Sequence, residues 1–254
     1  MATEVFRRHE KKYRVPAAAF EALQDKLSDF MELDRYNEGR FTYPICNLYY
    51  DTADSALIRK SLQKPAYKEK LRLRSYGSPP DLNSIVYAEI KKKVAGVVGK
   101  RRCAMPLGTA YAYLESGQEP PLTPEMNPQI LHEITWMLRQ GLQPAVVIAY
   151  DRRAFFCPTR PDLRISFDTN IRSRRYDLRL EDGDYGDLLL PADTWLMEIK
   201  TVGSFPLHLS HLLAEYEIYP ASFSKYGTEY KQFLAGNPAP FPEWEVLPEA
   251  ASVE

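Results

Sequence analysis

Charged and apolar residues alternate along several stretches of this chain, which is the pattern of a β-strand with one buried face. In residues 68–74, Leu71 and Leu73 alternate with four cations, so leucines and cations point to opposite faces. The same spacing places two charged residues on one face in five segments: Glu10 and Lys12, Arg72 and Arg74, Glu89 and Lys91, Lys100 and Arg102, and Glu198 and Lys200. These strands are therefore expected to carry a charged face opposite an apolar one.

Periods of two and of 3.6 residues divide the chain into strands and helices. Alternation predicts strands over residues 4–14, 45–51, 68–76, 85–94, 97–105, 145–157, 163–175 and 194–202. Helical spacing predicts helices over residues 16–31, 53–62, 107–118, 128–139, 207–216 and 222–234. The order predicts an α+β fold in which about eight antiparallel strands close a tunnel-like β-barrel with peripheral helices. We expect one domain over residues 1–236 and a loosely ordered tail over residues 237–254.

Several cations facing one enclosed space are costly to bury unless that space holds water, a metal ion or a polyanion. For residues 68–76 alone, a solvent-facing surface explains the pattern equally well, although two arginines favour phosphate because each guanidinium can bind two oxygens. Glu89 is as well explained by a salt bridge as by metal binding. Glu198 and Lys200 lie in a strongly apolar strand, where the recurrence of the pattern favours a lined site over a simple buried ion pair. The sequence thus predicts an anion-binding cavity.

Composition narrows the partners that such a cavity can serve. The 254 residues include 33 Lys and Arg against 34 Asp and Glu, so no overall positive field attracts nucleic acid, and a polyanion site must be local. Three scattered cysteines without ligand spacing argue against disulfides and structural zinc. The N-terminus lacks the apolar core of a signal peptide and no apolar run approaches membrane length, so we expect a soluble, cytoplasmic protein.

Motifs that rely on a nucleotide-binding loop or a protein nucleophile are missing. The sequence has no P-loop, no GxGxxG, no HExxH and no GxSxG. The four histidines share no motif with Cys or Asp, and we expect His208 and His211 to be surface or core residues rather than metal ligands. Serine or cysteine nucleophile chemistry therefore has no support.

Two further segments carry weaker signals for anion binding. Ser222, Ser224 and Lys225 lie at the start of a predicted helix, where free backbone amides favour phosphate, although a plain N-cap is the commoner role. Arg152 and Arg153 are adjacent on a predicted strand and face opposite ways, so at most one of them can enter a shared interior.

These motifs together resemble the catalytic domain of the vacuolar transporter chaperone (VTC) family, which comprises polyphosphate polymerases of the CYTH-like, triphosphate tunnel superfamily. The resemblance extends from about Arg8 to Tyr230. Its motifs are Lys12-Tyr13, Leu71-Arg-Leu-Arg-Ser-Tyr-Gly77, Glu89-Ile-Lys91, Lys100-Arg-Arg102, Tyr150-Asp-Arg-Arg-Ala-Phe155, Leu163-Arg-Ile-Ser-Phe-Asp-Thr169, Met197-Glu-Ile-Lys200 and Phe223-Ser-Lys-Tyr226. It implies an antiparallel tunnel barrel that binds a phosphate chain along its axis.

The resemblance also implies roles for individual residues. The implied phosphate-binding residues are Lys12, Arg72, Arg74, Lys91, Lys100, Arg102, Arg152, Arg164, Lys200, Ser224 and Lys225. The central catalytic roles fall to Arg72, Arg74, Lys200 and Glu198. Glu198 corresponds to the family's metal-binding glutamate, with Glu89 and Glu10 as helpers, and the expected metal is Mn²⁺ or Mg²⁺.

The implied activity is transfer of the γ-phosphate of ATP to the end of a growing polyphosphate chain. The terminal phosphate can itself attack, so no protein nucleophile is needed. Hydrolytic tunnel enzymes resemble one another in an E-x-E-x-K first strand, whereas this chain has Arg8-x-Glu10-x-Lys12, which favours the polymerases. The alternatives are an inorganic tripolyphosphatase or triphosphatase, with triphosphate or pyrophosphate as ligand, and a non-catalytic polyphosphate-binding module. Coupling of synthesis to membrane translocation would need a separate membrane protein partner.

Overall fold

The computed structural model describes residues 8–94 and 97–236, and its centre is one strongly curved antiparallel sheet. Eight strands pair in the order β1 (Arg8–Pro16), β10 (Thr194–Val202), β8 (Arg164–Arg174), β7 (Gln143–Phe156), β3 (Tyr43–Asp51), β4 (Tyr67–Tyr76), β5 (Ile85–Val94) and β6 (Val97–Pro106). Two short strands extend it: β2 (Glu32–Leu33) pairs with β7, and β9 (Asp187–Leu188) pairs with β8. The antiparallel fold with peripheral helices is as expected from the sequence.

The barrel is not closed by backbone hydrogen bonds, which corrects the expectation of a closed tunnel. Among the described residues, the two outer strands of the order, β1 and β6, do not pair with each other. A side-chain contact spans the gap instead, because Lys91 Nζ on β5 lies 3.7 Å from a carboxylate oxygen of Glu10 on β1. This ion pair links β1 to β5 across the gap, and the sheet encloses its inner face only partly.

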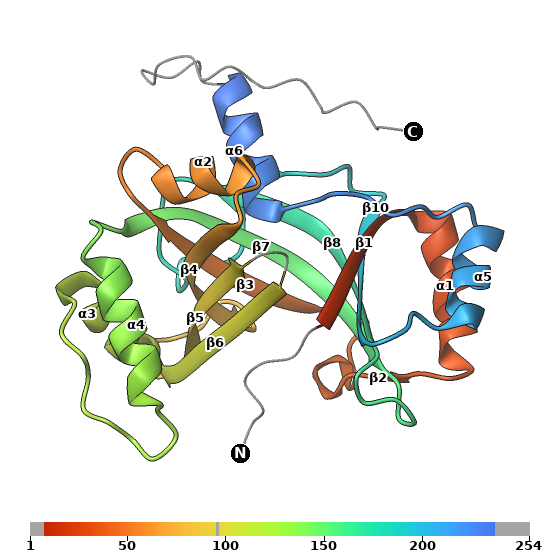
Figure 1. The fold of residues 1–254 in the computed structure, drawn as a ribbon, viewed down its shortest axis with the longest axis horizontal. Helices are drawn as coiled ribbons and strands as arrows, with labels where there is room; N and C mark the ends of the chain where they lie inside the picture. The colour runs from red at the N-terminus through yellow and green to blue at the C-terminus, as the bar shows by residue number, and fades with distance from the viewer. Residues whose placement is uncertain (1–7, 95–96, 237–254) are drawn as a thin grey trace.

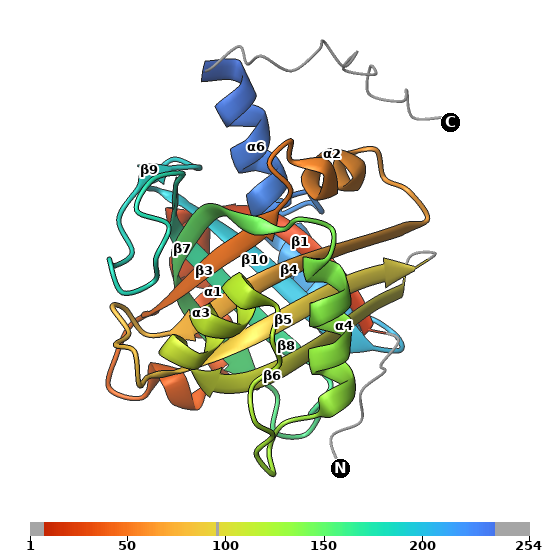
Figure 2. The same ribbon diagram turned by 90° about the vertical axis from the view of Figure 1, so that its left-hand side faces the viewer.

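Helices cover the outer face of the sheet on two sides (Figures 1 and 2). On one side, α1 (Ala17–Ser28) and α5 (Leu207–Glu215) bury Phe20 and Leu209 against β1, β8 and β10. On the other, α3 (Leu107–Ser116) and α4 (Pro128–Leu138) pack on β4, β5 and β6 around Leu71 and Leu73. The outward-facing apolar residues of each strand therefore form the main cores, which leaves the charged residues on the inner face.

A third apolar cluster occupies part of the inner face. It lies beneath α2 (Ala56–Leu62) and α6 (Lys225–Gly236), which are drawn side by side above the strands in Figure 1. Tyr226 of α6 packs 4.9 Å from Tyr49 of β3 and donates to the buried carboxylate of Asp51 at 2.9 Å. This cluster borders the charged residues directly, because its Tyr49 and Tyr150 accept hydrogen bonds from Arg72 and Arg74, each at 3.0 Å.

Several boundaries differ from those predicted, for local reasons. The helix expected at residue 53 begins at Ala56, because Asp51 accepts hydrogen bonds from the amides of Leu57 and Ile58 and Ser55 has a left-handed backbone. The helix expected at residue 222 begins at Lys225. The sequence reading also missed β2, β9 and the 3₁₀ helix η1 (Arg35–Asn37), which are too short to show a period. The expected tail over residues 237–254 lies outside the described residues.

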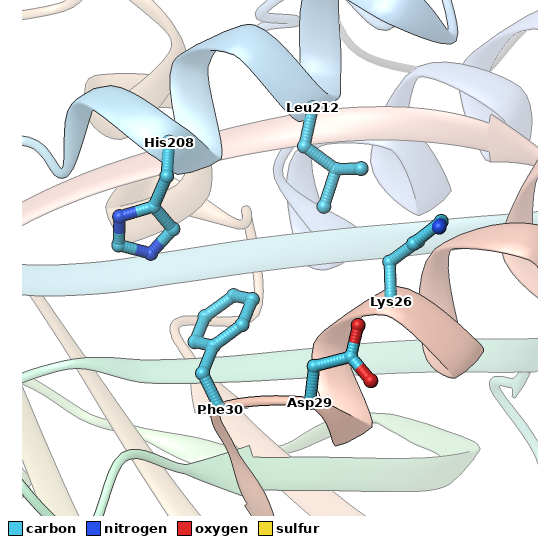
Figure 3. Close-up of a pocket in the computed structure, with 5 residues that line it drawn as sticks. All are labelled: Lys26, Asp29, Phe30, His208 and Leu212. Carbon is cyan, nitrogen blue, oxygen red and sulfur yellow. The ribbon is translucent and has the colours of Figure 1, made fainter.

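A surface pocket lies between two of the helices. Figure 3 shows a shallow pocket between α1 and α5, in which the ring of His208 lies edge-on to Phe30 with centroids 4.8 Å apart. Across residues 8–94 and 97–236, none of the helices is long and apolar enough to cross a membrane.

Candidate active site

The register of the strands brings the charged pairs together on the inner face. Glu10 and Lys12 of β1 lie opposite Lys200 and Glu198 of β10. On the other half of the sheet, Arg72 of β4 lies opposite Glu89 of β5, which in turn lies opposite Arg102 of β6. Because side chains directly opposite each other share a face, separate strand patterns become one surface.

Glu89 holds three cations together. Its carboxylate accepts from Arg72 Nε at 2.9 Å and Nη2 at 2.8 Å, and it lies 2.5 Å from Lys100 Nζ and 3.8 Å from Arg74 Nε. Only 1% of Glu89 is exposed. Burial would raise its pKa, but Arg74, Arg72 and Lys100 hold that pKa far below its usual range. Glu89 is therefore an ionised anchor for these cations.

A second cluster forms where β1, β10 and β5 approach one another. Lys12 Nζ lies 3.3 Å from Glu10 and 3.9 Å from Glu198, and Lys200 forms an ion pair with Glu198. Burial would raise the pKa of Glu198, but Lys200, Lys12 and Lys91 hold it well below its usual range. Two ionised carboxylates thus share one ammonium group.

This second cluster fits a divalent cation better than Glu89 does. Magnesium is commonly held by one or two carboxylates that are completed by substrate phosphates, and Glu10 and Glu198 could supply such a pair. Both oxygens of Glu89 face cations at 2.9 Å or less, whereas Lys12 and Lys91 lie 3.3–3.9 Å from the oxygens of Glu10 and Glu198, and Lys200 is the cation of this second cluster in close contact with Glu198. Within the described part of the chain, no group of three or more His, Cys, Asp and Glu side chains is placed to hold a metal. The three predicted glutamates therefore do not converge on one point.

A third cluster contains a carboxylate that the sequence reading did not single out. Asp168 of β8 is fully buried and accepts from Arg152 at 2.7 and 2.9 Å and from Lys225 of α6 at 2.6 Å. Burial would raise its pKa, but Arg152 and Lys225 lower it to about 2. Lys225 also lies 4.2 Å from the centroid of the Tyr150 ring. The alternation of Arg164, Ser166 and Asp168 along β8 was a usable signal for this position.

Lys70 is a further cation on the inner face that was not among the predicted site residues. It shares the face of Arg72, and its Nζ lies 3.4 Å from Ser224 Oγ and 5.6 Å from the centroid of the Tyr226 ring. Within the described residues it makes no ion pair, and burial lowers its pKa to about 8. Tyr49 is adjacent and accepts from Arg72 at 3.0 Å. Burial would raise the pKa of Tyr49, but Arg72 and Lys70 lower it to about 8.

Other predicted residues lie at the margins. Arg164 sits opposite Lys200 in the register but is exposed, and Arg102 is exposed with its guanidinium 4.6 Å from the ring centroid of Tyr87. Ser224 is the residue before α6, and its hydroxyl accepts from the amide of Gly227 at 3.2 Å, which is N-cap geometry. Arg153 donates to the carbonyl of Phe41 on the outer face, so only Arg152 of the adjacent pair turns inward.

Comparison with models of known protein families identifies the family of this chain. The model of the VTC domain matches residues 7–234. The chain belongs to the VTC domain family. The matched range spans almost the whole chain and includes every residue of the three clusters. Comparison with curated proteins finds no match.

Comparison with solved structures finds one that shares the fold of this VTC domain at a TM-score above 0.5. A protein assigned as an adenylate cyclase from Bacillus halodurans superposes with a TM-score of 0.53 at 15% identity, covering 88% of this chain and 96% of that one. One so assigned from Vibrio parahaemolyticus gives a TM-score of 0.49 at 15% identity, covering 91% and 99%. The Mimivirus capping enzyme triphosphatase gives 0.34 at 8% identity, covering 83% and 89%. The first match shows that this chain shares the overall fold of that protein.

Proposed function

We propose that this VTC domain is a metal-dependent polyphosphate polymerase, which transfers the γ-phosphate of ATP to the end of a growing phosphate chain. The observation that carries the proposal is the charge of the inner face. Nine cations contact the three clusters or lie beside them, against the four carboxylates Glu10, Glu89, Asp168 and Glu198; the cations are Lys12, Lys70, Arg72, Arg74, Lys91, Lys100, Arg152, Lys200 and Lys225. A surplus of five positive charges in a protein with a net charge of −1 suits a polyanion.

Phosphoryl transfer depends mainly on positioning and on neutralising charge, and the site offers both. Arg72 and Arg74 are fixed by Glu89 and by hydrogen bonds to Tyr49 and Asn47, so their guanidinium groups are ordered before a ligand binds. In this proposal they orient the phosphate chain, and the terminal phosphate is the nucleophile. Glu198 and Glu10 would hold the divalent cation, Mn²⁺ or Mg²⁺, which would neutralise phosphate charge. The three free cysteines support a cytoplasmic location.

The products formed from ATP test the proposal. Purified protein with ATP and Mn²⁺ is expected to form polyphosphate and ADP. Release of orthophosphate from tripolyphosphate without chain growth would assign the tripolyphosphatase reaction instead. Saturable binding of polyphosphate without turnover would make the domain a binding module.

Replacing Arg72 and Arg74 together by alanine is expected to weaken polyphosphate binding by more than about hundredfold. Hydrogen bonds to charged groups each contribute about 1.5–3 kcal/mol, and both guanidiniums point into the charged interior. Isothermal titration with tripolyphosphate measures the change, and a thermal melt checks that the variant is folded. Arg139→Ala, at the exposed end of α4, is the matched control and should bind normally. Unchanged affinity in the double variant would refute the tunnel as the binding site.

Anion affinity is expected to fall by about tenfold as pH rises from about 7 to about 9.5, because Lys70 loses its proton above a pKa of about 8. A bound phosphate favours the charged form of Lys70, so Lys70 takes up a proton when phosphate binds in this pH range. Tripolyphosphate titrations at several pH values measure the effect. Lys70→Arg stays cationic and should lose less affinity, with a residual slope because Tyr49 ionises above a pKa of about 8 and because burial lowers the pKa of Lys91 and Lys100. If the affinity of Lys70→Arg fell with pH as steeply as that of the wild-type protein, Lys70 would be excluded as the source of the pH dependence.

A further inference from the structure

Aromatic side chains gather at one end of the inner face, just beyond the cations of β4 and β7. Tyr43 begins the inner face of β3, Tyr76 ends that of β4, and Tyr87 is near the start of β5. The rings of Tyr76 and Tyr87 meet edge to face at 5.5 Å. Tyr36 of η1 stacks on Tyr76, with centroids 5.2 Å apart and planes inclined by 15°, and lies 5.5 Å from Tyr43. Four strand and loop segments thus build one aromatic surface.

This surface is positively charged and partly open to solvent, since Tyr76 and Tyr87 are half-buried and Tyr43 is buried. Tyr36 is 37% exposed, although its ring is already ordered by Tyr76. The guanidinium of Arg35 lies 5.1 Å from the Tyr36 centroid, and that of Arg102 lies 4.6 Å from the Tyr87 centroid. Arg102 is exposed and forms no salt bridge within the described residues. Flat rings and flat guanidinium groups left available to solvent are the surface on which nucleobases stack.

The aromatic surface is continuous with the phosphate-binding interior. Arg74 precedes Tyr76 by two residues on the same face of β4, about 7 Å along the strand, and its guanidinium lies 5.8 Å from the Tyr76 centroid. Arg152 lies opposite Tyr43 in the register. A ligand with phosphates beside these arginines would therefore place any group attached to its outer phosphate over the rings.

We propose that the surface formed by Tyr36, Tyr76, Tyr87 and Arg102 binds the base of a nucleoside triphosphate, while its phosphates enter the charged interior. The inference rests on the proposed function, since it locates the nucleotide donor. Such a surface would distinguish the nucleotide donor from the product, because inorganic polyphosphate carries no base that could stack on the rings. Stacking depends on the face of a base and not on its edge, so GTP should bind about as well as ATP.

Binding of ATP and of inorganic tripolyphosphate to the full chain tests the proposal directly. Tyr36→Ala is expected to weaken ATP binding by about tenfold, as loss of a base–aromatic stack does, and to leave tripolyphosphate binding within about twofold. Tyr36→Phe keeps the ring and should bind both ligands normally. Tyr219→Ala, at another exposed tyrosine, is the surface control. Arg102→Ala should also weaken ATP more than tripolyphosphate.

The outcomes separate this inference from the proposed function. An equal loss of both ligands in Tyr36→Ala, or no loss of ATP, would overturn the base-binding surface while leaving the charged interior as it is. A selective loss of ATP in a protein that makes no polyphosphate would support the surface and refute the polymerase. If the wild-type protein bound neither ligand, both proposals would fail.

Discussion

Replacing Glu198 by glutamine is expected to slow polyphosphate synthesis by about hundredfold or more while leaving tripolyphosphate binding intact. Glutamine has the same shape but no charge, so it cannot neutralise a cation as the carboxylate does. Loss of one preorganised electrostatic group in an active site typically costs a factor of 10²–10³ in rate. Glu198 is 8% exposed and pairs with Lys200 and Lys12, so its removal leaves these ammonium groups free for phosphate. We therefore expect kcat to fall with affinity unchanged or higher.

The rate of polymer formation from ATP and a separate titration with tripolyphosphate measure the two effects. Glu133→Gln is the matched control, because Glu133 also holds two cations, Lys92 and Arg101, but does so between α4 and the outer face of the sheet. It should keep normal activity. Full activity in Glu198→Gln would show that this carboxylate is not the metal ligand.

Local alternation was enough to predict the inner face of the sheet. Leu71 and Leu73 are fully buried in an outer core, which forces Arg72 and Arg74 inward, and the same reasoning placed Glu198. A period of two is a property of the strand itself, so it can be recognised without knowing which strands are neighbours. The charged pairs were therefore predictable from short segments.

The partners of these residues could not be predicted in this way. Whether Glu89 binds a metal or anchors arginines depends on the register of β4, β5 and β6, which joins residues far apart in the sequence. The role of Asp168 depends on its contact with Lys225, which lies 57 residues later in the sequence. Closure of the barrel failed as a prediction because strand number alone does not fix whether the outer strands meet.

Glu89→Gln separates the two roles that the sequence left open for Glu89. If this carboxylate is an anchor, the variant is expected to lose about 3–5 kcal/mol in its free energy of unfolding, because Arg72 and Arg74 keep their charge without a partner. Urea unfolding measures the loss. Tripolyphosphate should restore more stability to the variant than it adds to the wild-type protein, since it supplies the missing negative charge.

The loss of folding stability at acid pH tests the role of Glu89 independently. The folded-state pKa of Glu89 lies far below its unfolded value of about 4.3, so its contribution is complete above that unfolded value and is lost as pH falls toward the folded pKa. Glu89→Gln should therefore lose less stability than the wild-type protein on acidification below about pH 4, with Asp168 still titrating in both. Glu89→Gln could instead keep wild-type stability at neutral pH while its rate of polyphosphate synthesis no longer depends on Mn²⁺. Glu89 would then be a metal ligand, and the anchor role would be wrong.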